Sequence, residues 1–250
     1  MRKIGIIFSV VLMVILTSFS ETKVVEETTA KEPIFSFNQY ACKLFNCVNI
    51  EGDINEDAFN IALKGYYSLL TKNELENKKY LTIVDMSLSS NVERFYVIDM
   101  EMEQLVYKSL VAHGRNTGQE FASSFSNKQS SYQTSLGFYK TAETYDGKRG
   151  FSMKLDGLEY SNSNARDRGI VIHGADYVSK QFIKDNGRLG RSLGCPSLPM
   201  DSFVKTVEIL KGGSCLFVYY PQKYYLKRSK IVNSSEDYLL TNTGLLSDED

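Results

Sequence analysis

The spacing of hydrophobic and polar positions separates a helical stretch from a longer strand-rich stretch. Apolar residues recur every three or four positions and predict one helix with a single apolar face: Phe59, Ala62, Leu63, Tyr66, Tyr67 and Leu70. Asp53 and Glu56 have the Asp-x-x-Glu spacing of a capping box, so we expect this helix to begin from Asp53. A helix with one apolar face typically packs on its own domain, which we expect here.

After Lys79 the pattern changes to short runs rich in Val, Ile, Tyr and Phe, separated by polar turns. Such runs are typical of β-strands. Three successive runs predict antiparallel strands at 81–85, 94–99 and 105–112. Later runs predict strands at 137–140, 151–155, 169–173 and 215–220.

Two short helices are expected within the strand-rich stretch. One covers 179–186, where Ser179 is placed to cap the helix and Gly187 to end it. The other runs from about 201 to 211 and stops at Gly212. The chain from 79 to 221 is therefore predicted to be a mainly β domain with short helices (α+β). We expect a helical segment at 35–78 before it and a polar, partly ordered tail at 222–250 after it.

The first residues have the order of a secretory signal peptide. A short basic start precedes an apolar stretch at 4–16, and small residues follow at Ser18 and Ser20. We therefore expect residues 1–20 to be a signal peptide, residues 21–34 to be a flexible tether, and the protein to be exported to the periplasm or cell envelope. The alternative is an uncleaved N-terminal anchor, the one case in which the chain would contact a membrane.

Charge and cysteine content narrow the classes of function. Lys and Arg number 29 and Asp and Glu number 30, which gives a net charge of −1 without a basic stripe, so nucleic-acid binding is not expected. Four cysteines in an exported protein allow three full disulfide pairings. Cys42 and Cys47 could form a local bridge or stay free, whereas Cys215 lies in an apolar run and is expected to be an inert buried thiol.

Cys195 and His173 are the candidate chemical groups. Cys195 lies in the run GRLGRSLGCPSLP, and His173 ends a predicted strand in IVIHGADYV. An imidazole that takes the proton of a thiol creates a reactive thiolate. Gly190 and Gly194 allow the backbone to approach a substrate closely, and the amides around Gly194 and Cys195 are candidates to bind an oxyanion. The alternative is a buried structural cysteine and a histidine with structural contacts.

These residues resemble those of the L,D-transpeptidase (YkuD-like) family, and more closely its murein L,D-transpeptidase subfamily. The resemblance rests on the stretch from His173 to Pro199 and on the upstream runs VAHGRNTG, FSN and SLGFY, and it covers roughly 79–221. It implies a β-sandwich or barrel with an N-terminal helical annex and a nucleophile at the rim of a sheet. It also implies peptidoglycan stem peptides as donor and acceptor, without a cofactor.

Carried over by position, the resemblance implies catalytic and substrate-binding residues. Cys195 would be the nucleophile, His173 the general base, and the carbonyl of Gly174 a group that orients the imidazole. Ser192 would shape the loop. Residues implied to line the cleft are His113, Asn127, Tyr139 and Tyr177.

Two positions depart from the wider family, which has a second histidine where this chain has Leu193 and usually an arginine where it has Ser197. Arg188 and Arg191 could supply the missing positive charge for a substrate carboxylate, because a guanidinium binds carboxylate with two parallel hydrogen bonds. The alternative is that both are solvent-exposed loop charges.

For His113 two roles are open. It could line the cleft or be structural, or it could compete with His173 as the base. A metal site built from His113, His173 and Cys195 is not expected, because no HxxxH, HxH or CxxC spacing is present.

The sequence thus predicts acyl transfer on cell-wall peptide through a thioester on Cys195. Three alternatives remain: an L,D-carboxypeptidase of the same fold, a catalytically silent wall-binding module, and an exported thiol peptidase with other substrates.

Overall fold

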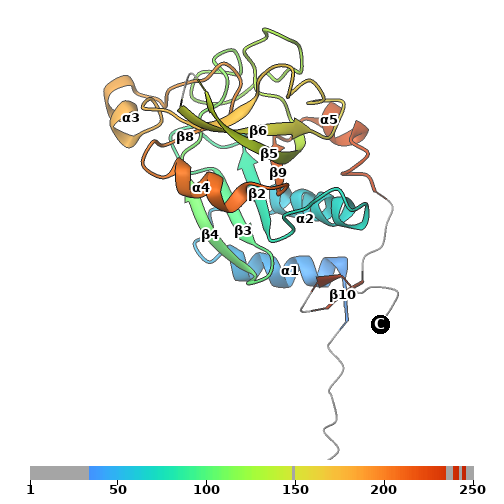
Figure 1. The fold of residues 1–250 in the computed structure, drawn as a ribbon. Helices are drawn as coiled ribbons and strands as arrows, with labels where there is room; N and C mark the ends of the chain where they lie inside the picture. Colours follow the sequence, from blue (N-terminus) through green and yellow to red (C-terminus); the bar gives the residue numbers. More distant parts are fainter. Residues whose placement is uncertain (1–33, 148–149, 235–238, 242–243, 246–250) are drawn as a thin grey trace, which may run out of the picture. The chain divides into compact units, whose positions relative to one another are not determined.

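The computed structural model describes residues 34–147, 150–234, 239–241 and 244–245. The predicted signal peptide and almost all of the predicted tether lie outside the described residues. The described chain is mainly β with short helices, as predicted (Figure 1).

An eight-stranded sheet forms the centre of the fold. Its strands are β2 (Tyr80–Asp85), β3 (Phe95–Asp99), β4 (Gln104–Ser109), β5 (Gly137–Gly147), β6 (Gly150–Gly157), β7 (Val171–Gly174), β8 (Ser197–Leu198) and β9 (Cys215–Tyr219). Their order across the sheet is β4-β3-β2-β9-β5-β6-β7-β8. The predicted antiparallel set β2-β3-β4 is confirmed, whereas β2 with β9 and β7 with β8 are parallel pairs.

The two ends of this sheet meet, so the strands form a nearly closed barrel. The amide of Ala112, three residues after β4, donates to the carbonyl of Ser197 in β8 over 3.0 Å. A second bridge joins Gly114 to Ser192. These two bridges bring the segment after β4 against the loop that carries Cys195.

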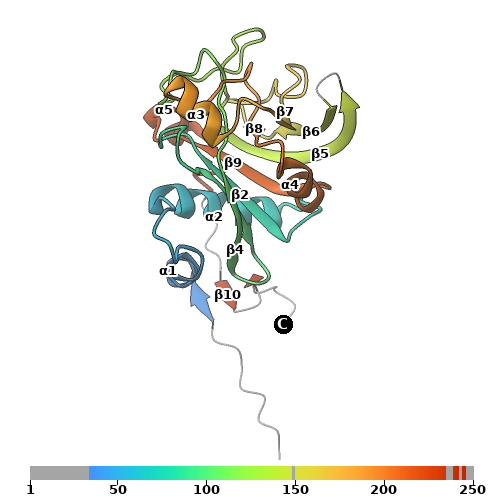
Figure 2. The ribbon, with the colours of Figure 1, turned by 90° about the vertical axis from the view of Figure 1, so that its left-hand side faces the viewer.

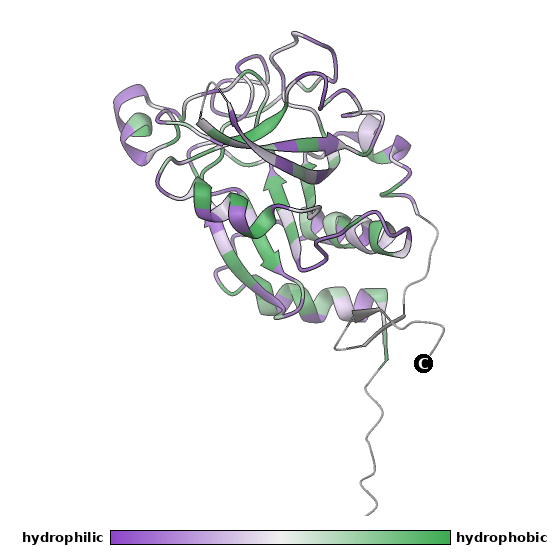
Figure 3. Cartoon of the chain, viewed as in Figure 1, coloured by the Kyte–Doolittle hydropathy of each residue, from purple (hydrophilic) through white to green (hydrophobic). Residues whose placement is uncertain are grey.

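Apolar side chains of the strands and of the N-terminal helices share one core. Figure 3 colours the strands and helices by the hydropathy of their residues. Helix α2 (Glu56–Thr71) contributes the predicted apolar face, with Phe59, Ala62 and Leu63 fully buried. The preceding helix α1 (Phe37–Val48) packs beside α2 and was not predicted as a separate element.

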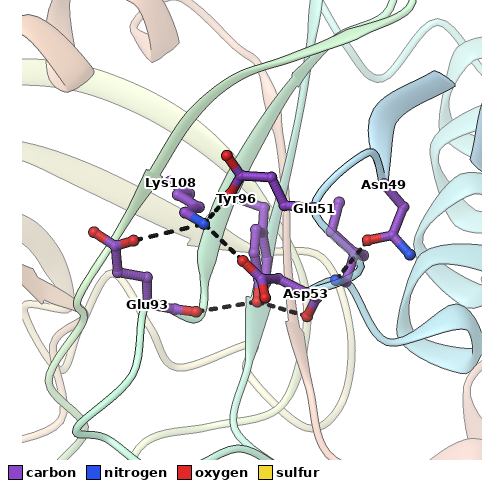
Figure 4. A network of polar contacts seen from close by, with 7 residues as sticks. Asn49, Glu51, Asp53, Glu93, Tyr96 and Lys108 are labelled. Atoms are coloured by element: carbon purple, nitrogen blue, oxygen red, sulfur yellow. Dashed lines mark hydrogen bonds and ion pairs between the residues drawn. The ribbon is translucent and has the colours of Figure 1, made fainter.

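The predicted start of α2 is wrong by two residues. Asn55, not Asp53, is the N-cap residue, and its Oδ1 accepts a hydrogen bond from the amide of Ala58 over 3.0 Å. The Asp53 carboxylate instead accepts from Lys108 Nζ over 2.6 Å, in the polar network drawn in Figure 4. A tertiary ion pair has therefore replaced the capping role that the local spacing indicated.

The two short predicted helices are present as α3 (Lys180–Asn186) and α4 (Phe203–Leu210). The predicted caps of α3 are confirmed: Ser179 Oγ accepts from the amide of Phe182 over 3.1 Å, and Gly187 ends the helix with a φ of 73°. Both helices lie on the same side of the barrel as β4 (Figures 1 and 2).

The region after Gln222 includes the short helix α5 (Lys223–Arg228). Its Tyr225 is buried, and the Tyr225 hydroxyl donates to Glu159 Oε2 over 2.7 Å. The same carboxylate oxygen accepts from the amide of Phe138 in β5 over 2.8 Å. Hydrogen bonds therefore hold this part of the predicted polar tail against the barrel.

A small second sheet joins the two ends of the described chain. It consists of β1 (Phe35–Ser36), β10 (Leu239–Thr241) and β11 (Gly244–Leu245), all antiparallel. Cys42 and Cys47 lie on α1 and are free and exposed, so the local bridge is not formed. Because five residues of an α-helix turn the chain by about 500°, these two side chains point in different directions.

Candidate active site

A cavity of about 620 Å³ contains both candidate chemical groups. Cys195 and His173 line it together with Tyr145 and Ser152 from the β5–β6 hairpin, Arg168, and the exposed side chain of Leu193. Cys195 is half-buried, so its sulfur is accessible from the cavity. The thiol and the imidazole that the sequence singled out are thus brought to one site.

His173 is held on both of its ring nitrogens. It sits in β7 between Ser152 of β6 and Ser197 of β8, each its direct partner in register. Its Nδ1 lies 2.9 Å from the carbonyl oxygen of Gly174 and its Nε2 lies 2.9 Å from Ser197 Oγ. A carbonyl oxygen only accepts, so Nδ1 carries the hydrogen, and Nε2 of the neutral ring is an acceptor that the Ser197 hydroxyl can bond.

The loop that carries Cys195 is shaped by Ser192. The Ser192 hydroxyl accepts from the amide of Gly194 over 3.0 Å and donates to the carbonyl of Cys195 over 2.6 Å. Gly194 has a φ of +127°, a conformation that side-chain-bearing residues rarely adopt. A Cβ at this position would also lie 2.9 Å from the carbonyl oxygen of Gln133. The tight turn therefore requires glycine.

The oxyanion assignment at Gly194 needs correction. Its amide is already bonded to Ser192 Oγ, so it does not point into the cavity as a donor for a substrate oxygen. An oxyanion donor from this loop must be another amide.

Arg168 is a charged residue of the site that the sequence did not reveal. It lines the cavity, and its guanidinium is held by the carbonyls of Gln133 (2.6 Å) and Ser126 (2.9 Å). Burial lowers the pKa of Arg168, while negative charge on Tyr139 or Cys195 opposes that shift. The positive charge is therefore near enough to the Cys195 sulfur to stabilise a thiolate. In the sequence, Arg168 is one of several charged residues in a polar loop, so no local signal distinguishes it.

Ser197 and Tyr177 extend the contacts of His173. The Tyr177 hydroxyl lies 3.1 Å from Ser197 Oγ, so a chain of three polar groups runs from Tyr177 through Ser197 to His173. Gly190 permits this position of Tyr177, because a Cβ on Gly190 would come within 2.4 Å of Tyr177 Cβ. Ser197 was noted only as a departure from the family, so its contact with the imidazole is new.

His113 does not line the cavity, so the cleft position implied by the resemblance is wrong and the structural alternative fits. It is fully buried, with its Nδ1 2.8 Å from Nη2 of the buried Arg94. Burial, together with the neighbouring charge of Arg94, lowers the pKa of His113 to about 4. The ring is therefore neutral at pH 7 and has a structural position.

Arg188 and Arg191 also lie outside this cavity. Arg188 donates to the carbonyl of Leu189 over 2.8 Å. Arg191 donates to the carbonyls of Arg115 and Gly118, each over 3.0 Å. These hydrogen bonds to backbone carbonyls stabilise the loop that carries Arg188 and Arg191. Positive charge at the cavity comes from Arg168.

Asn127 and Tyr139 are structural as well. Asn127 binds the carbonyl of Tyr160 and the amide of Asn164, each over 3.1 Å, and so holds two loops together. Tyr139 is buried, and its hydroxyl contacts Ser135. Neither lines the cavity that contains Cys195.

Among the described residues, no group of three or more His, Cys, Asp or Glu side chains is placed to hold a metal ion. None of the helices within the described ranges is long and apolar enough to cross a bilayer.

The eight strands form a nearly closed barrel, and one open cavity contains both a thiol and an oriented imidazole. The family model for the L,D-transpeptidase catalytic domain matches residues 50–219, and the chain belongs to this family. The matched region includes α2 as well as the large sheet.

Solved structures to which the chain is similar include an L,D-transpeptidase from Mycobacterium smegmatis, with 12% identity and a TM-score of 0.36 over 57% of this chain and 59% of that chain. A helical cell shape determining protein from Campylobacter jejuni has 14% identity and a TM-score of 0.38 over 64% of this chain and 57% of that chain. The match thus spans less than two thirds of those chains. No curated protein matches the sequence.

Proposed function

We propose that this protein cross-links peptidoglycan stem peptides by L,D-transpeptidation, with Cys195 as nucleophile and His173 as general base. The observation that carries the proposal is their joint position in one cavity, with His173 Nδ1 bound to the Gly174 carbonyl. That contact leaves the lone pair on Nε2, the nitrogen that a general base uses. Membership of the family supports the substrate class.

In the first half-reaction, His173 takes the thiol proton and the Cys195 sulfur attacks the carbonyl carbon of the third stem residue. The C–S bond forms and the C–N bond to the terminal D-amino acid breaks. The leaving amine takes the proton from His173, and a thioester remains. The nearby guanidinium of Arg168 favours the anionic sulfur that attacks.

In the second half-reaction, an amine of a neighbouring stem attacks the thioester carbon. The new C–N bond forms, the C–S bond breaks, and the amine proton passes to His173 as the sulfur leaves. If water attacks instead, the product is a shortened stem and the protein acts as an L,D-carboxypeptidase. Both outcomes use the same acyl-enzyme.

The proposed substrate agrees with the predicted export of the chain, because stem peptides lie beyond the cytoplasmic membrane. The signal peptide predicted at 1–20 would bring the enzyme to the cell envelope. Neither half-reaction consumes a nucleotide or requires a redox cofactor.

The test is incubation of the purified protein with muropeptides that carry tetrapeptide stems, followed by mass analysis. We expect release of the terminal D-amino acid, formation of a cross-linked product, and loss of both in Cys195→Ala. Cys47→Ala is the matched control, because Cys47 is an exposed thiol on α1. Release that persists in Cys195→Ala would overturn the nucleophile assignment. No release by the unmodified chain would favour a silent wall-binding module.

A further inference from the structure

A second cavity has a volume of about 580 Å³. Its walls come from β4, from the segment that leads from β7 into α3, and from residues 199–202 after β8. Apolar side chains on these walls are Tyr107, Leu110, Ala175, Val178, Pro199 and Met200. We call this cavity the β4 groove.

Residues two positions apart in the chain line the β4 groove and the catalytic cavity. His173 lines the catalytic cavity and Ala175 lines the groove. The amide of Ala175 still bonds the carbonyl of Leu198 over 2.9 Å, so the extended chain continues past the end of β7. Side chains two residues apart in an extended chain share a face and are separated by about 7 Å. The groove thus begins within reach of the imidazole.

The groove exists because the barrel seam opens at Pro199. Ala112 pairs with Ser197 across the seam, but Pro199 has no amide hydrogen to continue the pairing. On the other side of β4, the carbonyl of Ser109 accepts from the amide of Arg94 over 3.0 Å. Because backbone groups alternate along a strand, those of Leu110 share the edge of Ala112 and face the groove.

An unpaired strand edge beside an open groove is the arrangement that binds an extended peptide by strand addition. The edge supplies backbone hydrogen bonds, and the groove receives alternate side chains of the peptide. The polypeptide part of a stem peptide is a ligand of this kind.

The groove has an acidic lining. Three carboxylates (Glu93, Asp176 and Asp201) face two ammonium groups (Lys108 and Lys180), which gives a charge of −1. Lys108 is also bonded to Glu51 and Asp53, outside the groove (Figure 4), and counting these two brings the charge to −3. Within the part of the chain that the structure describes, neither Asp176 nor Asp201 has an ion-pair partner. Such a lining attracts a peptide that carries a free amine.

We propose that the β4 groove binds the acceptor stem peptide as an added strand on β4. This inference rests on the proposed transpeptidation, because that reaction needs a second peptide with a free amine. The groove then places the amine-bearing peptide about two residues along β7 from His173, while the donor occupies the catalytic cavity. Asp176 and Asp201 attract the ammonium group of the incoming acceptor.

The first test measures binding without turnover, in the Cys195→Ala variant of the full chain. The probes are a synthetic stem peptide with a free side-chain amine and the same peptide with that amine acetylated. We expect the amine peptide to bind more tightly and to slow hydrogen exchange of the Leu110 amide. The Asp176→Asn/Asp201→Asn pair should weaken its binding about tenfold, as two exposed ion pairs of modest strength allow. Asp185→Asn, on α3 but outside the groove, is the matched control and should change nothing.

The second test separates the two half-reactions in the enzyme with Cys195 intact. In Asp176→Asn/Asp201→Asn we expect donor acylation of Cys195 at the normal rate and an acceptor KM raised about tenfold. An unchanged acceptor KM, or exchange protection confined to the catalytic cavity, would overturn the groove assignment. A chain that is never acylated by donor would refute the proposed function instead, and the binding test in Cys195→Ala does not depend on that result.

Discussion

Ser197 Oγ lies 2.9 Å from Nε2 of His173, the ring nitrogen that the proposed mechanism uses as its base. The Gly174 carbonyl holds the other nitrogen, so the imidazole is fixed at both ends. A hydroxyl can donate to the neutral Nε2 and can accept from it after protonation. Ser197 can therefore keep the ring in place while His173 takes and returns a proton, which makes it a positioning residue.

Removing this hydroxyl should slow the chemistry without changing substrate affinity. For Ser197→Ala we expect a roughly tenfold lower kcat, the scale of one lost hydrogen bond to a group that becomes charged. KM for the donor should change little. Steady-state kinetics with a tetrapeptide donor provide the measurement, and Ser197→Thr, which keeps a hydroxyl, is the control. If KM rises while kcat stays constant, Ser197 contacts substrate and does not position His173.

Cys195 should be the most reactive thiol of the folded protein. Cys42 and Cys47 are exposed and will also be alkylated, so labelling is best read in a Cys42→Ser/Cys47→Ser background. Cys215 should not be alkylated, because it is fully buried and burial raises the pKa of its thiol. At pH 6 we expect one rapid iodoacetamide adduct on Cys195, located by peptide mass analysis.

The comparison for this experiment is the rate at which Cys42 and Cys47 react in Cys195→Ala. An activated sulfur beside a guanidinium and an imidazole should react faster than these ordinary surface thiols. Equal rates would mean that Cys195 is not activated in the resting protein.

The two histidines of the chain should differ sharply in their effect on turnover. His173→Ala should lower the rate by at least about 10²-fold, as expected for loss of a positioned base. His113→Asn should keep most of the activity, because His113 is buried against Arg94 and does not line the cavity. Initial rates of D-amino acid release measure both effects. Loss of activity in His113→Asn alone would reverse the assignment of the base.

The strands, and the pairing of Cys195 with His173, could be predicted from the sequence because short runs of neighbouring residues indicate them. Runs of β-branched and aromatic residues predicted β2, β3 and β9, and a glycine-flanked thiol with a strand-end imidazole predicted Cys195 and His173. The two-residue strand β8 is too short to show alternation, although it carries Ser197.

Residues whose roles depend on tertiary contacts could not be assigned from the sequence. Asp53 had the spacing of a helix cap and instead binds Lys108, and Arg191 had the charge for a substrate contact and instead binds backbone carbonyls. Arg168 had no local mark, and Ser197 was noted only as a departure from the family. Their positions follow from barrel closure, which brings distant loops to one cavity.

His113 should make the stability of the protein depend on pH in mildly acidic solution. Burial, and after it the charge of Arg94, lowers the pKa of His113 from about 6.5 to about 4. At a pH between these two values, the unfolded chain therefore binds a proton on His113 that the folded chain does not bind. The contribution of this neutral ring is fully present above pH 6.5 and is lost as pH falls toward 4. Between pH 7 and pH 5 the loss should be about 2 kcal/mol of unfolding free energy.

Denaturant unfolding of the wild type and of His113→Asn at pH 7 and pH 5 isolates this effect. Burial raises the pKa of Asp85 and of Glu159, so these two carboxyls increase the unfolding free energy as pH falls. Because the wild type and His113→Asn both contain them, their contribution cancels in the comparison. The amide side chain introduced by His113→Asn would offer an oxygen to Arg94 without titrating. The variant should therefore lose less stability than the wild type between the two pH values. Equal losses in both proteins would show that His113 is not the group that titrates, whatever the absolute stability of the variant.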